Sequence, residues 1–381
     1  MRGRRLDAHA RSAVCDADGR FSLGDVLLEE GANPLTLRVV DAAGNATASN
    51  LVVDCVPGAA DEADPVLAWS ATVLDTIRMA SAAPPIATRA LALESIAVLD
   101  VVNALDGAPG YWVDLDPAAE GLSVGAAVAG AAHRVLAALF PGQQAALDAA
   151  LALRLAGEPE GEARERALDF GESVADAVLA LRAGDGWNAT LPYTGGTDPG
   201  EWRPTPPASA PALLPHWGLV TPFVLDSADQ FRPDGPPSLT SAEYAAALEE
   251  VRLLGSATSA ARTAEQTEIA RFWVDGAGTF TPPGHWVAIA GEFAEAEGYG
   301  GAAAARMLAV LNVALADSSI AAWDAKYAHG LWRPVTAIRE AAADGNDATT
   351  ADPGWTPLLT TPNHPEYVSG HSTYSAAGRR C

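Results

Sequence analysis

The chain has 381 residues, a formal net charge of −24 at pH 7 and an isoelectric point near 4.5. That length predicts one large domain or two domains. The negative charge argues against nucleic acid and anionic membranes as partners, because both would repel the protein. No uninterrupted apolar run reaches the length of a membrane span, and three cysteines alone do not indicate an oxidising compartment.

Residues 1–57 have the pattern of short β-strands. Strand-forming runs occur at 21–23, 35–40 and 51–53, with turn sequences between them. The segment resembles the last strands of bacterial immunoglobulin-like repeats on secreted proteins. About three strands are too few for a complete sandwich, which has about seven. Two interpretations therefore stay open: the tail of an immunoglobulin-like repeat, or a small β appendage on the main domain.

Residues 58–64 have the composition of a short polar linker, and residues 65–381 are predicted to form a helical domain. The change comes at Asp64-Pro65, an N-cap residue followed by a proline suited to the first helical position. Apolar periodicity predicts helices at 66–81, 123–139, 143–156, 160–183, 282–297 and 301–318, and another that follows Pro84-Pro85 and ends at about 105. Capping boxes at Thr240 and Thr263 predict that two further helices begin there, and a last helix is predicted to begin near Ser319. Alanine-rich faces allow close approach, so we expect a mainly α, compact helical bundle.

Residues 184–239 interrupt the helical pattern. The segment holds many of the prolines of the chain together with Trp187, Trp202 and Trp217. Such a density of proline excludes helix, and the aromatic content is too high for a disordered linker. We predict a long ordered excursion that wraps the bundle, a type of segment that is often functional.

The first chemically informative motif contains Lys326 and Arg333, seven residues apart, with Pro334 directly after the arginine. Lys326 is the only lysine of the chain. On one continuous helix, that spacing would put both side chains on the same face, with Cα atoms about 10 Å apart. A lysine and an arginine together suit an oxyanion such as phosphate or vanadate. An isolated pair of this kind more often marks a solvated basic face.

The second motif is Ser369-Gly370-His371, predicted at the start of a helix. Backbone amides at a helix N-terminus bind anions, and glycine lets an oxyanion approach the main chain. The serine hydroxyl adds a donor, and the histidine is suited to acid/base work. Alone, the motif also fits an ordinary serine N-cap beside a surface histidine.

Together, Lys-x6-Arg-Pro and Ser-Gly-His resemble the first two signature motifs of the superfamily that joins vanadium-dependent haloperoxidases with type 2 phosphatidic acid phosphatases and bacterial acid phosphatases. The surrounding residues resemble the haloperoxidase branch, notably Trp323-Asp-Ala-Lys-Tyr, Trp332-Arg-Pro-Val-Thr-Ala-Ile-Arg339 and His364-Pro-Glu-Tyr-Val-Ser-Gly-His. Similar stretches at 200–205, 217–223 and 262–266 extend the resemblance to about residues 64–378.

The resemblance implies a helical-bundle fold of the haloperoxidase/acid phosphatase type that binds vanadate. By motif match, Lys326, Arg333, Ser369 and the Gly370 amide would hold its equatorial oxygens, and His371 would be the catalytic acid/base. Trp323 and His364 would border the halide and peroxide pocket. The implied reaction oxidises halide with hydrogen peroxide to hypohalous acid.

The sequence departs from the family pattern at two places. Val368 replaces the usual proline before Ser-Gly-His. The third motif, an arginine and a histidine tens of residues further on, is absent before the chain ends at Ala376-Ala-Gly-Arg-Arg-Cys381. In the family, that histidine binds vanadium in the peroxidases and is the nucleophile in the phosphatases. We therefore expect a C-terminally truncated domain with no vanadium-ligating histidine and an incomplete active site.

The leading hypothesis is thus a haloperoxidase-like protein that uses hydrogen peroxide and halide when complete. The first alternative is an acid phosphatase of the same superfamily, acting on a phosphate ester, because both share the anion pocket. The second is an inactive oxyanion-binding or structural remnant. The immunoglobulin-like start favours export, although the chain carries no signal peptide. We expect no membrane span, and oligomerisation is compatible with the sequence.

Overall fold

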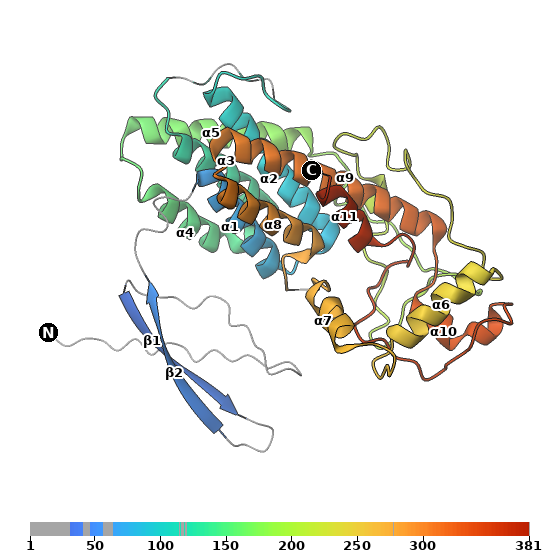
Figure 1. Cartoon of the computed structure of the whole chain (residues 1–381). Coiled ribbons are helices and arrows are strands. Elements are labelled where there is room, and N and C mark those ends of the chain that lie inside the picture. The colour runs from blue at the N-terminus through green and yellow to red at the C-terminus, as the bar shows by residue number, and fades with distance from the viewer. Residues whose placement is uncertain are drawn as a thin grey trace. The chain divides into compact units, whose positions relative to one another are not determined.

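The computed structural model describes residues 31–40, 46–55 and 64–380, apart from residues 114, 116, 117, 119 and 277. The chain divides into two compact units, Met1–Ala63 and Asp64–Cys381, and each is described by itself. Figure 1 shows a β-hairpin in the first unit and a set of helices in the second.

The described part of the first unit is a single antiparallel hairpin. Strand β1 (Gly31–Val40) pairs with β2 (Ala46–Cys55) over their whole lengths, from Gly31 opposite Cys55 to Val40 opposite Ala46. The strands predicted at 35–40 and 51–53 lie inside β1 and β2, whereas the one at 21–23 lies outside the described residues. Two strands are far from the seven of an immunoglobulin sandwich, so the described residues give the immunoglobulin-like assignment no support.

The second unit is mainly helical, as the sequence predicts. Its α-helices are α1 (Pro65–Ala80), α2 (Pro84–Leu105), α3 (Val124–Leu139), α4 (Gln144–Leu155), α5 (Glu162–Leu181), α6 (Ala242–Leu254), α7 (Ala264–Phe272), α8 (Thr281–Glu297), α9 (Gly301–His329), α10 (Pro334–Arg339) and α11 (Gly370–Gly378). Short 3-10 turns lie at Pro141–Gln143, Trp217–Leu219 and Ala341–Ala343.

Helix starts follow the capping chemistry of the sequence. Asp64 caps α1, because its carboxylate accepts hydrogen bonds from the first-turn amides of Val66 and Leu67. The capping box predicted at Thr263 forms at the start of α7. The capping box predicted at Thr240 and Glu243 does not form: Ser241 is the N-cap of α6, and its hydroxyl accepts a hydrogen bond from the Tyr244 amide. Serine caps helices at least as well as threonine, so the Thr-x-x-Glu spacing did not identify which of the two neighbouring residues is the N-cap.

The core of this unit is built around α2 and α9. Helix α2 is buried on nearly every side, and it packs against α3, α5 and α9. Small residues allow these helices to approach closely. At Gly171 of α5, an added Cβ would lie 2.0 Å from the carbonyl oxygen of Ala127 in α3, so any larger residue would push the two helices apart.

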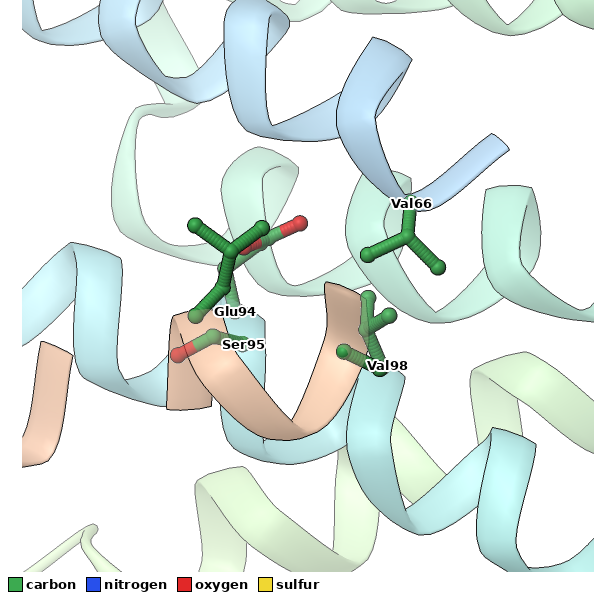
Figure 2. A pocket seen from close by; sticks show the side chains of 6 residues that line it. Val66, Glu94, Ser95 and Val98 are labelled. Carbon is green, nitrogen blue, oxygen red and sulfur yellow. The ribbon is translucent and has the colours of Figure 1, made fainter. Parts of the chain in front are cut away.

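One carboxyl group lies inside this apolar core. Glu94 of α2 is 3% exposed and lines a gap with Val66, Val98 and Leu308 that has no room for a water molecule (Figure 2). Burial raises the pKa of Glu94 from its ordinary 4.5 to about 8. Within the described residues, no cation or hydrogen-bond donor offsets that burial, so the carboxyl is protonated at neutral pH.

Helix α9 corrects two expectations from the sequence. A helix end near 318 and a new start near 319 were predicted, but α9 runs unbroken to His329. It ends there because Gly330 adopts a left-handed conformation with φ 58°, which glycine tolerates without strain. Lys326 and Arg333 therefore do not lie on one helix face, as their spacing had suggested. Arg333 is instead the extended N-cap residue of α10.

The predicted excursion at 184–239 is ordered and mostly irregular. Asp317 anchors the excursion on α9. Its buried carboxylate accepts hydrogen bonds from three backbone amides, those of Phe223, Val224 and Leu225, at 2.6, 2.8 and 2.9 Å. A second anchor lies after α9, where the Trp202 amide donates to the Gly330 carbonyl at 2.7 Å. The excursion thus fixes the segment that carries Arg333.

Within the described residues, α9 is long and apolar enough to cross a membrane by length and composition alone, and the pair α3–α4, bent by 115°, would count as a second such span. However, 67% of the apolar window of α9 is buried inside the protein. That burial is typical of a central bundle helix, whose apolar faces meet other helices.

Candidate oxyanion site

The last turn of α9 places Lys326 at the centre of the candidate site. Its side chain is 1% exposed, and its Nζ donates to the backbone carbonyls of Pro365, Glu366 and Val368, the first two at 3.0 Å. Burial, then the charge of Arg333, lowers the pKa of Lys326 from 10.5 to about 7, which Glu366 partly opposes. All three N–H groups of the ammonium are therefore used by the chain itself.

Arg333 stands at the start of α10. A small second core, formed by Tyr244, Leu248, Trp332, Val335, Ala337, Ile338, Ala341 and Trp355, holds α10 against α6. The arginine Nη1 lies 2.8 Å from the Glu366 Oε2, and its side chain is 14% exposed. The two groups form an ion pair without hydrogen-bond alignment, and the buried Arg333 Nε has no partner among the described residues. One guanidinium donor is thus left over.

The N-terminus of α11 supplies the third part. The Ser369 hydroxyl caps the helix by accepting the Ser372 amide at 3.2 Å. Gly370, the first helical residue, lies against Trp323, because a Cβ there would be 3.8 Å from the indole. Helix α11 packs on α9 (Figure 1), and a buried hydrogen bond of 3.0 Å joins the hydroxyls of Ser319 and Tyr374.

Two histidines and a tryptophan complete the surroundings. The rings of Trp323 and His364 have centroids 5.3 Å apart, and the indole Nε1 donates to the Leu213 carbonyl at 3.2 Å. Burial and the charges of Lys326 and Arg333 hold the pKa of His364 well below its ordinary value, so its imidazole is neutral. His371 also lowers that pKa, which places it within electrostatic reach, and its own side chain is exposed.

The structure therefore brings together all seven residues singled out from the sequence: Trp323, Lys326, Arg333, His364, Ser369, Gly370 and His371. The donors suit an oxyanion, because the buried Arg333 Nε has no partner among the described residues and Arg333 lies within electrostatic reach of Lys326. Lys326 in turn contacts the residue before the N-cap of α11. Lys326 can bind an oxyanion only if its ammonium gives up one of its hydrogen bonds to the backbone carbonyls and donates that N–H to the oxyanion instead. The described residues include no group of three His, Cys, Asp or Glu side chains suited to a metal ion.

Glu366 is the site residue that sequence reasoning missed. It lies inside the quoted His364-Pro-Glu-Tyr stretch, yet a lone surface-type glutamate in a polar loop carries no signal of a partner. The pairing with Arg333 is created by the fold, which returns the 365–368 segment to the end of α9. No local pattern would have identified it.

Comparison with known proteins agrees with this geometry. The family model described as the VCPO second helical-bundle domain matches residues 306–381, which contain all seven site residues. The vanadium chloroperoxidase of Curvularia inaequalis is 27% identical over 378 residues, covering 77% of this chain and 60% of that protein. The chain thus spans less than two thirds of the curated relative that it matches.

Solved structures give the same result. A bacterial vanadium-dependent iodoperoxidase has a TM-score of 0.71 and 29% identity, over 83% of this chain and 79% of that chain. The chain is thus similar in sequence and fold to vanadium haloperoxidases. Bacterial vanadium-dependent chloroperoxidases in the apo and holo forms share the fold, each with a TM-score of 0.60 and 20% identity over 78% of this chain. They cover 77% and 76% of those chains. The haloperoxidase resemblance drawn from the two motifs is confirmed.

Proposed function

We propose that this haloperoxidase relative binds vanadate at the junction of α9, α10 and α11, as part of a vanadium-dependent haloperoxidase. The observation that carries the proposal is that Lys326 and Arg333, from separate helical elements, both contact the 365–368 segment that leads into α11. The Lys326 Nζ donates to three of its carbonyls, and Arg333 pairs with Glu366. Nothing in local sequence forces these donors together, so a shared anionic ligand is the simplest reason for the arrangement.

Each donor has a distinct part in holding the oxyanion. The Arg333 guanidinium offers a planar fork with a spare Nε, and Lys326 offers a buried point charge. The Ser369 hydroxyl and the Gly370 amide would donate from the helix end, where the glycine leaves room for close approach. The vanadate would act as a Lewis acid that activates hydrogen peroxide for halide oxidation.

The neighbouring side chains would control water and protons. His371 is exposed at the first turn of α11, where its imidazole can accept or donate a proton at the edge of the site. The rings of His364 and Trp323 are in tilted contact, and the neutral imidazole adds no competing charge. These two would border the halide and peroxide pocket, shielding it from bulk water.

A second candidate function is supported by one observation. All three donors of Lys326 are taken by backbone carbonyls, which is the arrangement expected of a structural remnant that binds no anion. A phosphatase of the same superfamily would use the same donors as a haloperoxidase. Binding and activity must therefore be measured separately.

Calorimetric titration of orthovanadate into the wild-type chain and an Arg333→Ala variant tests the proposal. Arg203→Ala is a matched control, since Arg203 also pairs with a glutamate, Glu340. We expect wild type and Arg203→Ala to bind alike, and Arg333→Ala to bind at least about tenfold more weakly, a loss of ~1.4 kcal/mol. Absence of wild-type binding would favour the remnant. Peroxide-dependent halogenation of a dye, against hydrolysis of a phosphate ester, then separates peroxidase from phosphatase.

A further inference from the structure

A carboxylate of the chain itself occupies the cationic side of the candidate site. The Glu366 Oε2 lies 2.8 Å from the Arg333 Nη1. The same residue offers its backbone carbonyl to Lys326 Nζ at 3.0 Å. One residue thus contacts both cations, through its side chain and its main chain. The single carboxylate neutralises part of the positive charge of this pair, and neutral carbonyls satisfy the hydrogen-bond donors of Lys326.

The contact between Glu366 and Arg333 has the properties of an exchangeable one. The charged atoms are close, but they are not aligned for a hydrogen bond, and the Arg333 Nε is left without a partner. The Glu366 side chain is 37% exposed, so it can rotate into water at low cost in solvation. A bound oxyanion would repel a carboxylate held at this distance from the same guanidinium.

We propose that Glu366 is an internal competitor for the oxyanion: its carboxylate holds Arg333 until vanadate or phosphate displaces it, and so sets the affinity of the site. The proposal rests on the oxyanion site proposed above. In the anion-bound form, the Glu366 side chain turns to solvent, Arg333 pairs with the oxyanion, and Lys326 exchanges a backbone carbonyl for an oxyanion oxygen. The competition weakens the binding of any anion to Arg333 by the free energy needed to separate the Glu366 carboxylate from the guanidinium.

The test is calorimetric titration of orthovanadate, and separately of inorganic phosphate, into wild type, Glu366→Gln and Glu340→Gln. Glu340 is the matched control, because it too pairs with an arginine, Arg203. Both variants remove one negative charge, changing the net charge from −24 to −23. At about pH 6, below the pKa of Lys326 at about 7, we expect Glu366→Gln to bind both anions about tenfold more tightly than wild type, and Glu340→Gln to match wild type.

A third variant guards against a purely structural effect. Glu366→Asp keeps the charge but withdraws it from Arg333, so its affinity should fall between those of wild type and Glu366→Gln. Equal or weaker binding by Glu366→Gln, with wild type still binding, would overturn the competitor role alone. An equal gain in anion affinity in Glu340→Gln would show that the effect comes from net charge, and would also overturn the competitor role of Glu366. No binding by any variant would overturn the oxyanion site itself.

Discussion

Replacing Glu94 by glutamine should remove a large part of the pH dependence of stability of the helical unit. The carboxyl is 3% exposed among apolar side chains, and burial raises its pKa from 4.5 to about 8. The folded protein therefore keeps the proton up to about pH 8, whereas the unfolded chain loses it near pH 4.5. Between these two pKa values the unfolded state binds fewer protons than the folded state. The stability contributed by the protonated Glu94 is therefore complete below about pH 4.5 and is lost as pH rises toward 8.

The size of the effect follows from the same shift. Each unit of difference in pKa corresponds to about 1.4 kcal/mol, so the contribution lost across the window is at most about 5 kcal/mol. The amide of a Glu94→Gln variant has no proton to lose, and its shape is close to that of the protonated carboxyl. We expect the free energy of unfolding of the variant, relative to that of wild type, to rise by about 1.4 kcal/mol per pH unit between about pH 5 and about pH 8.

Urea unfolding followed by far-UV circular dichroism at several pH values measures this difference. Titrations common to both proteins cancel when the two are compared at each pH. Glu172→Gln is the matched control, because Glu172 is exposed on α5 and should show no such trend. A difference in unfolding free energy between wild type and Glu94→Gln that stays constant from about pH 5 to about pH 8 would show that Glu94 does not take up a proton on folding.

Three further predictions follow from the packing and the site. Gly171→Ala should destabilise the helical unit by about 3 kcal/mol, because its Cβ would meet the Ala127 carbonyl at 2.0 Å, whereas Gly291→Ala, in open space on α8, should stabilise it by about 0.5 kcal/mol. Urea midpoints that shift equally would contradict this. Asp317→Ala should lower the free energy of unfolding by about 3 kcal/mol, because three backbone amides lose their acceptor. The 184–239 excursion should then become sensitive to limited proteolysis, and an unchanged cleavage pattern would count against this prediction. Vanadate affinity should weaken above about pH 7, where Lys326, with its lowered pKa, loses its charge; an affinity that is flat from about pH 6 to about pH 9 would oppose the assignment.

The helices of the second unit were largely predictable, because their signals are local. Asp64 and Thr263 cap the helices that their positions suggested, and the ends of α3, α5 and α8 fall close to the predicted ones. The break predicted near 318 was wrong, because α9 continues through Asp317 and Ser319. In the fold, Ser319 bonds Tyr374 of α11, and Asp317 anchors the excursion, so both polar groups are satisfied inside a continuous helix.

The candidate site was predictable in its members but not in its construction. The motifs identified Lys326 and Arg333, yet the assumption of one shared helix face was wrong, because Gly330 ends α9 between them. Their proximity comes instead from the chain reversal after α9. Glu366 and the carbonyls that bind Lys326 depend on contacts made across about forty residues of sequence, which a local pattern does not encode.

A crystal structure of the chain with bound tungstate, a heavy-atom analogue of vanadate, would show directly whether Lys326, Arg333 and the start of α11 bind one oxyanion. We expect one anomalous peak within hydrogen-bond reach of the Arg333 guanidinium and the Gly370 amide, with Lys326 Nζ turned toward it and the Glu366 carboxylate displaced. A peak at another place, or none at a tungstate concentration that saturates calorimetric binding, would contradict the assignment of these residues to one oxyanion site.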